Sequence, residues 1–208
     1  MTRRARGRPA ATDSADTHAA IIDAARLSFA SEGFDGASLS AIARDVGLAP
    51  SALYHYVDDK RDLFEQVATA TVETVWGRLL EVVGRGGDFA TQLDRYMSAV
   101  VRLSRPDRGS SAFLLSLPIE ARRHPEFQPL VMLVRLQQRQ VFDCMARRGV
   151  ESGDIVAFGD DTVRATERGS AALQMLLLGW SYQSHYTPEH REQLGVIVRA
   201  SIDGWCRR

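Results

Sequence analysis

The sequence has few of the residues that mark disulfide frameworks, metal sites or membrane spans. Its 208 residues include only two cysteines, Cys144 and Cys206, which lie far apart. Because no CxxC or Cys/His pattern occurs, we expect two free thiols and no metal site. The longest apolar run, around residues 173–180, is far shorter than the roughly 20 residues of a membrane span, and no apolar signal core follows the basic N-terminus. These absences predict a soluble, cytoplasmic protein.

The sequence also lacks the motifs of common enzyme classes. It contains no GxSxG, HExxH, phosphate-binding loop or Cys/His/acid spacing, and the acidic pair Asp160 and Asp161 falls in a predicted loop. We therefore predict a protein without catalytic residues and without a cofactor. The formal net charge is zero, so binding to nucleic acid would depend on a local patch, such as the arginines of residues 1–10, and not on the overall charge.

Apolar residues recur at helical spacing along nearly the whole chain, and no convincing strand pattern interrupts them. This periodicity predicts an all-α fold of about nine helices. Residues 1–16 are polar, small and basic, and we expect them to form a flexible arm. The predicted helices cover residues 17–32, 39–46, 50–56, 60–83, 88–104, 110–122, 125–148, 162–186 and 188–207.

Residues 38–60 contain a short helix, a glycine turn and a second short helix, which is the order of a helix-turn-helix. Leu39 and Ile42 are placed to face the first helix, Leu53 faces inward from the second short helix, and the small Ala43 allows the two helices to cross closely. Gly47 can adopt a positive φ in the turn, where a Cβ would clash. The outward residues of the second helix are Pro50, Ser51, Ala52, Tyr54 and His55. A bundle without a ligand would more often expose charged residues at these positions.

Several short pieces around this motif occur together at fixed spacing: Gly33-Phe34, Ser38-Leu39, Ile42-Ala43, Val46-Gly47-Leu48, Leu53-Tyr54-His55-Tyr56, Lys60 and Asp62-Leu63-Phe64. In this combination the chain resembles the tetracycline-repressor (TetR) family of bacterial regulators. The resemblance implies a helix-turn-helix DNA-binding domain at residues 17–64, and a larger helical domain at residues 65–208 that binds an effector and dimerises. It implies a transcriptional repressor that a small, mostly apolar effector releases from a near-palindromic operator.

The resemblance also implies individual contacts with the DNA backbone. Tyr54 matches an aromatic that packs against the backbone, and His55 matches a residue that touches phosphate or a base edge. Lys60 matches a phosphate-binding lysine, and Ser38 matches a phosphate-binding hydroxyl at the start of a helix. Arg44 is a further phosphate candidate. Such contacts set affinity and register.

Reading of the base sequence would depend on the first turn of the second short helix, at Pro50, Ser51 and Ala52. Serine can bond several bases, and alanine or proline can contact a thymine methyl. The chain has alanine where the family often has a hydroxyl residue, at Ala37, Ala49 and Ala52. These departures remove a helix cap and two hydroxyls, so we expect DNA shape and the N-terminal arm to contribute to recognition.

The arm carries arginines at Arg3, Arg4, Arg6 and Arg8. Arginines on a flexible tether can enter a narrow minor groove, where the potential is most negative. A solvated tail without a DNA contact is the alternative interpretation, because many terminal charge runs have no partner.

One helix-turn-helix is too small to select a site in a genome, and a dimer would present two recognition helices about 34 Å apart. The last two helices are the predicted dimer surface, because each has an apolar stripe that could join a four-helix bundle. The alternative is that this stripe belongs to the core of one chain. The residues of the stripe are Leu173, Leu176, Leu177, Trp180, Leu194, Ile197, Val198, Ile202 and Trp205.

The family resemblance implies a ligand among the central helices, and aromatic and methionine side chains there would suit an apolar effector. The same residues at helical spacing could equally be plain core. The predicted wall consists of Trp76, Met97, Phe113, Phe142, Met145, Gln174 and Met175.

Three other functions remain open at this point. An enzyme would turn over a substrate without affinity for DNA. A helical adaptor would use the helix-turn-helix only as scaffold, which the outward Tyr54-His55 pair and the arginine arm argue against. An activator of the same fold cannot be separated from a repressor by sequence.

Overall fold

The computed structural model describes residues 11–104, 108–159 and 161–206. In this part of the chain the structure is helical, and its one β feature is an isolated bridge between Ile155 and Cys206. The α-helices are α1 Ala11–Gly36, α2 Leu39–Asp45, α3 Pro50–Leu53, α4 Lys60–Val72, α5 Arg78–Gly84, α6 Phe89–Ser104, α7 Arg108–Arg123, α8 Gln128–Glu151, α9 Thr162–Tyr186 and α10 Arg191–Asp203. A π-turn, η1 Glu73–Gly77, joins α4 to α5, and 3₁₀ turns η2 Pro125–Phe127 and η3 Pro188–His190 precede α8 and α10. The predicted all-α class is confirmed.

The first helix starts earlier than the periodicity predicts. α1 begins at Ala11, so residues 11–16, which we expected in the arm, are helical. No glycine or proline lies between Ala10 and Glu32, and nothing in the local sequence therefore stops a helix in this direction. At its other end the regular helix stops at Gly33, whose φ of 73° is left-handed, as expected for a helix-ending glycine.

The fourth predicted helix is one continuous rod with an internal irregularity. It runs from Lys60 to Gly84 as α4, η1 and α5, and the π-turn inserts an extra residue into the hydrogen-bond ladder. Such bulges are frequent at functional sites. Gly86 and Gly87 follow with φ of 86° and 98°, which confirms the predicted break after Val83.

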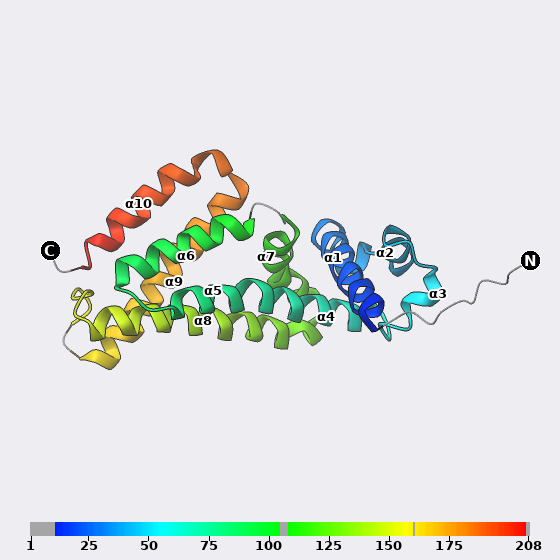
Figure 1. The fold of residues 1–208 in the computed structure, drawn as a ribbon, viewed down its shortest axis with the longest axis horizontal. Coiled ribbons are helices and arrows are strands. Elements are labelled where there is room, and N and C mark those ends of the chain that lie inside the picture. The colour runs from blue at the N-terminus through cyan, green and yellow to red at the C-terminus, as the bar shows by residue number, and fades with distance from the viewer. Residues whose placement is uncertain (1–10, 105–107, 160, 207–208) are drawn as a thin grey trace, which may run out of the picture.

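The helices form an elongated molecule with the N-terminal helices at one end and α10 at the other (Figure 1). The α4–α5 rod and α8 run lengthwise against each other, and α7 connects them to α1. Pro118 lies inside α7, which continues past it to Arg123. No helix among the described residues has the length and apolar character needed to cross a membrane.

The core is continuous across the predicted domain boundary at Phe64. The fully buried ring of Phe64 lies edge-on to Phe29 of α1 at 5.0 Å and stacks on Phe127 at 4.4 Å. Phe34 contacts Phe127 at 4.9 Å, and Phe64 contacts Phe113 of α7 at 5.2 Å between ring centres. Aromatic pairs of this kind add to the burial energy. This aromatic cluster therefore couples the first three helices to the rest of the chain.

Candidate DNA interface, effector cavity and dimer surface

The helix-turn-helix is built as the sequence predicts. Ile42 and Ala43 of α2 and Leu53 of α3 are completely buried against α1 and α4. Gly47 has a φ of 73° in the turn, and the amide of Leu48 donates to the carbonyl of Ala43 at 2.8 Å. The predicted roles of these residues in the scaffold are confirmed, and they hold α3 in a fixed orientation.

The outer side of α3 is exposed and carries no charge. Pro50, Ser51, Tyr54 and His55 are exposed, with Tyr54 at 58%, and Ala52 is half-buried. Pro50 occupies the first helical position, where its missing N–H has no intrahelical acceptor to lose. The regular helix ends at Leu53, three residues before the predicted end, and continues as a turn to Tyr56. These side chains therefore form one accessible surface at the end of the molecule.

The end of this turn is fastened to α1 and α4. His18 lies against the Tyr56 ring at 6.3 Å between centres. The same histidine bonds the Gln66 side chain at 2.8 Å, and Gln66 reaches the carbonyl of Tyr56 at 3.4 Å. These contacts were not predicted, because they join positions 48 and 10 residues apart in sequence.

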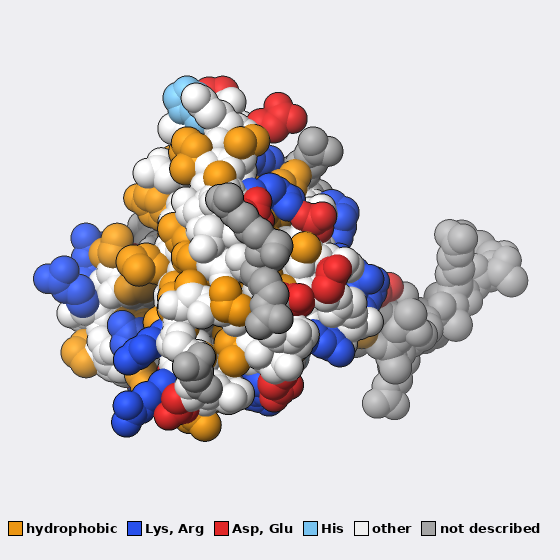
Figure 2. Space-filling model, turned by 90° about the vertical axis from the view of Figure 1, so that its left-hand side faces the viewer, with side chains coloured by type: hydrophobic (Ala, Val, Ile, Leu, Met, Phe, Trp, Pro, Cys, Tyr) orange, Lys and Arg blue, Asp and Glu red, His pale blue; other side chains and the backbone are white. Residues whose placement is uncertain are grey.

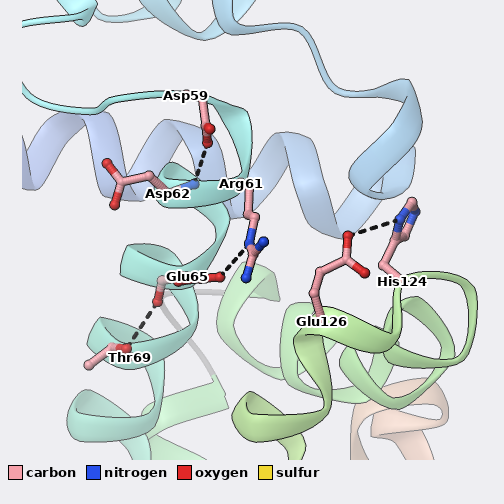
Figure 3. Close-up of polar contacts among 7 residues, drawn as sticks. All are labelled: Asp59, Arg61, Asp62, Glu65, Thr69, His124 and Glu126. Carbon is pink, nitrogen blue, oxygen red and sulfur yellow. Dashed lines mark hydrogen bonds and ion pairs between the residues drawn. The ribbon is translucent and has the colours of Figure 1, made fainter.

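The start of α4 is capped by acidic side chains (Figure 3). The Asp59 carboxylate accepts the amide of Asp62 at 2.8 Å, and the Asp62 carboxylate accepts the amide of Asp58 at 2.9 Å. This reciprocal arrangement satisfies amides that the helix leaves without partners. One turn on, Arg61 donates to Glu65 at 2.8 Å, and this hydrogen bond raises the pKa of the Arg61 guanidinium.

Lys60, for which the resemblance implies a phosphate, is bonded within the protein. Its Nζ donates to the carbonyls of Asp35 at 3.1 Å and Ala37 at 3.2 Å, and lies 4.8 Å from the centre of the Phe34 ring. The ammonium group thus satisfies one carbonyl in the last turn of α1 and one just after it, and makes a cation–π contact. Its primary task in this structure is to hold the α1–α2 connection against α4.

The other basic side chains near the interface are few. Residues 11–67 contain Arg26, Arg44, Lys60 and Arg61 as their only Lys or Arg, and acidic residues outnumber them. Arg26 is buried and bonds Asp23 and Thr71, while Arg61 bonds Glu65. Arg44 is exposed, although its Nε donates to the carbonyl of Ser40 in its own helix.

Two further predictions concern the edges of the interface. Ser38 is exposed and stands at the N-cap of α2, but its side chain makes no capping hydrogen bond. Its hydroxyl is therefore accessible for another partner. The predicted arm residues Arg3, Arg4, Arg6 and Arg8 lie outside the described residues.

A cavity of about 360 Å³ lies between the α4–α5 rod and helices α6, α7, α8 and α9. Its wall is mainly aliphatic and aromatic, with a few hydroxyl and amide groups. The lining residues are Val75, Trp76, Leu79, Tyr96, Val100, Leu103, Ser110, Ser111, Leu114, Leu115, Val134, Gln138, Leu178, Gly179, Ser181, Tyr182 and His185. Clefts of this size and composition hold small molecules.

Of the predicted wall residues, Trp76 lines this cavity. Phe113, Phe142, Met145 and Met97 are buried core side chains that the cavity does not touch. Gln174 lies one step behind the wall, where its amide donates to Gln138 at 3.5 Å. Met175 is 73% exposed on the outer face of α9. The structure thus corrects six of the seven positions, because helical spacing does not tell which buried face borders a void.

Two polar groups of the wall are buried and make no hydrogen bond of ordinary geometry within the described residues. They are the indole N–H of Trp76 and the hydroxyl of Tyr96. Burial raises the pKa of Tyr96 above its ordinary value, and the nearby Ser181 hydroxyl offsets part of this rise. The Ser181 hydroxyl itself donates to the carbonyl of Leu177 at 2.7 Å. Tyr96 was not predicted, since a lone tyrosine on an apolar stripe gives no such signal.

The residues predicted as the dimer surface are largely core of the single chain. Leu173, Leu177 and Ile202 are completely buried, and Trp180 and Val198 are nearly so. These five side chains pack within the chain, which corrects their assignment to a contact surface. Leu176, Leu194 and Trp205 are half-buried, while Ile197 is 56% exposed. The Trp205 ring lies against Phe158 at 5.2 Å, and its carbonyl accepts the amide of Val156.

The same two helices nevertheless expose a second apolar face. Met175 and Tyr182 of α9 and Val196 and Ile197 of α10 are between 48% and 73% exposed. Figure 2 views the α10 end of the molecule and shows hydrophobic side chains spread in a broad band over it, with basic side chains at the edge. Exposed apolar side chains on two adjacent helices are typical of a surface that meets another protein.

Comparison with known proteins shows what the helix-turn-helix region resembles. Residues 21–67, which contain the helix-turn-helix, match the family model of bacterial regulatory proteins, tetR family. The helix-turn-helix of the chain is therefore similar to that of bacterial tetR-family regulators. The chain is 28% identical over 115 residues to the HTH-type transcriptional regulator UidR of Escherichia coli, covering 55% of the chain and 57% of UidR. It is also 28% identical over 144 residues to an HTH-type transcriptional regulator of Mycobacterium tuberculosis, covering 66% of the chain and 58% of that protein.

The chain thus matches just under three fifths of the length of these curated relatives. Solved structures share its fold over more of its length. A TetR-family transcriptional regulator from Agrobacterium tumefaciens superposes with a TM-score of 0.73 at 17% identity, covering 93% of this chain and 99% of that one. A protein from Saccharomonospora viridis in complex with choline superposes with a TM-score of 0.75 at 16% identity, covering 93% and 100%.

Proposed function

We propose that the chain is a homodimeric, sequence-specific regulator of transcription whose affinity for its operator is set by a small effector in the cavity. The observation that carries the proposal is the accessible, uncharged outer face of α3, held rigidly by a fully packed helix-turn-helix. Repression is the role typical of the family, and an activator with the same interface is the second candidate. A cytoplasmic location fits either role.

The DNA contact would involve the first turn of α3 in the major groove, at Pro50, Ser51 and Ala52, with Tyr54 and His55 against the backbone. Few basic side chains support this face, because all four of those in residues 11–67 make a hydrogen bond within the protein, although Arg44 is exposed. Since phosphate neutralisation supplies much of the affinity for DNA, the arginine arm would have to provide most of the positive charge.

The two-fold partner would be a second copy of the chain, bound through the exposed face of α9 and α10. A palindromic operator requires two recognition helices about 34 Å apart, and α9 and α10 expose large apolar side chains such as Met175, Val196 and Ile197. Gly179 and Tyr182 belong both to this face and to the cavity wall. Dimer geometry and effector binding would therefore influence each other.

The switch would act through the α4–α5 rod. The rod starts at Lys60 beside α1 and α2 and passes Trp76 in the cavity wall, so a ligand that prefers one position of Trp76 would bias the position of the DNA-binding helices. Ordinary allosteric coupling amounts to about 1–3 kcal/mol. The choline complex of the Saccharomonospora viridis protein supports small-molecule binding within this fold.

The test is to select bound fragments from the source genome and then to measure affinity for the selected site. Tyr54→Ala should weaken binding about tenfold on the selected site and on random DNA alike, because a backbone contact carries no sequence information. Leu27→Ala, at an exposed position of α1 outside the interface, is the matched control. Failure to recover any site, or equal affinity of the two variants, would contradict the proposal.

The salt dependence of the same binding curves tests Lys60. If Lys60 neutralises a phosphate, Lys60→Ala should lower the slope of log affinity against log salt by about one. We expect an unchanged slope and a lower free energy of unfolding, because the Nζ already bonds two carbonyls. Deletion of residues 2–8 removes the arginines of the arm and should reduce the magnitude of the slope by about one for each phosphate contact that is lost.

A further inference from the structure

The side chain of Gln66 joins three separate elements at the DNA end of the molecule. Its Nε2 donates to the Asp62 carboxylate at 3.0 Å and to the carbonyl of Tyr56 at 3.4 Å. Its Oε1 lies 2.8 Å from Nε2 of His18 in α1. The side chains of His18, Asp62 and Gln66 are half-buried. Because Gln66 itself lies in α4, one amide group connects α1 and α4 with the turn that follows α3.

The directions of the hydrogen bonds in this network follow from the chemistry of its acceptors. A backbone carbonyl and an ionised carboxylate can only accept, so both of them face the NH2 group of the Gln66 amide. The oxygen of the amide therefore faces His18, and the histidine Nε2 donates to it. An imidazole keeps this N–H when it takes up a second proton. The bond from His18 to Gln66 thus persists across the pH range in which histidines usually titrate.

The same network holds the connection between α3 and α4 at two points. Asp62, at the start of α4 (Figure 3), accepts the amide of Asp58 at 2.9 Å as well as the Gln66 amide. The carbonyl of Tyr56, two residues before Asp58, accepts from the same Gln66 amide. The Tyr56 ring also lies against His18, with 6.3 Å between ring centres. The connection is therefore held by α4 on one side and by α1 on the other.

Apolar packing alone does not set the orientation of the turn that follows α3. Leu53 and Val57 are 0% and 3% exposed and hold the turn against the core, but apolar burial has no preferred direction. Hydrogen bonds are directional, so the bond to the Tyr56 carbonyl limits rotation of the turn about its apolar anchor. Tyr54 and His55, for which we propose DNA contacts, directly precede Tyr56. Their orientation therefore depends on the network.

We propose that His18 and Gln66 are positioning residues for operator recognition, which act through Tyr56 on the side chains that meet the DNA. This inference rests on the proposed function, because it concerns how the same interface is oriented. A binding surface has to be held within about 0.5 Å of its productive geometry. Phosphate contacts form on any sequence, whereas the sequence is read at the base edges. Loss of the network should therefore lower affinity for the operator more than affinity for random DNA.

The experiment removes the two contacts of His18 separately in the full chain. His18→Phe keeps a ring beside Tyr56 and removes the hydrogen bond to Gln66, whereas His18→Gln keeps a donor of similar reach and removes the ring. Fluorescence anisotropy should show affinity for the selected operator lowered about threefold to tenfold in His18→Phe, as expected for one hydrogen bond. His18→Gln should stay within about twofold of the unaltered protein. Gln66→Met has nearly the same length without the amide, and it should lose at least as much as His18→Phe.

Thr71→Val is the matched control, because it breaks another side-chain hydrogen bond between α1 and α4. The Nε of Arg26 donates to the Thr71 hydroxyl at 3.1 Å, and both residues are buried. This bond lies further along both helices than the bond from His18 to Gln66, away from the end of α4 that meets the turn. Thr71→Val should therefore lower the free energy of unfolding without a change in operator affinity. A merely structural network would give the same result for His18→Phe and Gln66→Met.

Hydrogen exchange of the protein without DNA gives a second readout that needs no operator. Residues 51–58 should exchange faster in Gln66→Met than in Thr71→Val or in the unaltered protein, and unchanged exchange there would overturn the inference. Equal losses of affinity on operator and random DNA, or operator affinities of His18→Phe and Gln66→Met that match the control, would also overturn it. If no operator is recovered for the unaltered protein, the proposed function fails and this inference with it. A recovered operator that His18→Phe binds normally contradicts this inference alone.

Discussion

The recognition helix α3 and the C-terminal pair α9 and α10 lie at opposite ends of the molecule and expose side chains of opposite character (Figure 1). At one end, the accessible groups are the hydroxyls of Ser51 and Tyr54 and the imidazole of His55. At the other end they are the apolar side chains of Val196 and Ile197. Polar groups suit a hydrated nucleic-acid surface, whereas an exposed apolar face suits a protein partner.

The α4–α5 rod links the two ends of the molecule without a flexible joint. The α4–α5 rod starts beside α2 and ends beside α6, and Phe64 anchors it in an aromatic cluster shared by α1, α7 and η2. Because interiors are close-packed, a displacement at one point is carried to its neighbours. A change at the cavity can therefore reach the helix-turn-helix without a flexible connection between them.

The largest expected effect comes from breaking this link. Phe64→Ala removes a fully buried ring that contacts four other rings, and we expect the free energy of unfolding to fall by about 3–5 kcal/mol. Urea denaturation at fixed protein concentration measures it. The exposed Leu27→Ala should change it by less than about 0.5 kcal/mol. A loss near that of Leu27→Ala would show that the cluster does not couple the two regions.

The second prediction separates the exposed apolar face from the buried stripe beside it. Ile197→Glu places a charge on the exposed face of α10, and we expect the dimer dissociation constant to rise by at least about tenfold, equivalent to about 1.4 kcal/mol. Sedimentation velocity over a range of concentrations measures it. The fold should persist, because Ile197 is 56% exposed in the single chain.

Two companion variants sharpen that result. Leu27→Glu puts the same charge on exposed apolar surface at the DNA end and should leave the dimer intact. Ile202→Ala affects the predicted stripe, but Ile202 is completely buried, so its main effect should be a loss of folding stability of about 2–5 kcal/mol. An unchanged dimer in Ile197→Glu would remove the exposed face as the candidate interface.

Sequence predicted the two ends to different degrees, for a physical reason. The helix-turn-helix depends on contacts between residues close in sequence, such as Ile42, Gly47 and Leu53. The position of each residue within this short motif therefore predicts its structural role. The scaffold and the exposure of Ser51, Tyr54 and His55 follow from that local pattern. The internal bonds of Lys60 did not, because they reach carbonyls 23 and 25 residues away.

The cavity and the dimer surface depend on how distant helices pack. Helical three-and-four spacing places Leu173 and Leu177 on one apolar face of their helix. It does not say whether α8, α10 or a second chain covers that face. The cavity wall likewise combines Trp76, Tyr96 and Ser181 from three separate elements. A void is a property of their arrangement in space, and so six predicted wall residues proved to be core, second-layer or surface positions.

The smallest expected effect is the difference in folding stability between variants of two N-cap residues, Asp59 of α4 and Ser38 of α2. The Asp59 carboxylate accepts the amide of Asp62 at 2.8 Å, so Asp59→Ala should cost about 1 kcal/mol of folding stability. Ser38 occupies the same cap position in α2 without a side-chain bond, so Ser38→Ala should leave stability unchanged. Urea denaturation of both variants measures the difference, and equal losses would contradict it. If the Ser38 hydroxyl binds phosphate, Ser38→Ala should weaken operator binding while its unfolding curve stays that of the unaltered protein, a combination that a structural cap cannot produce.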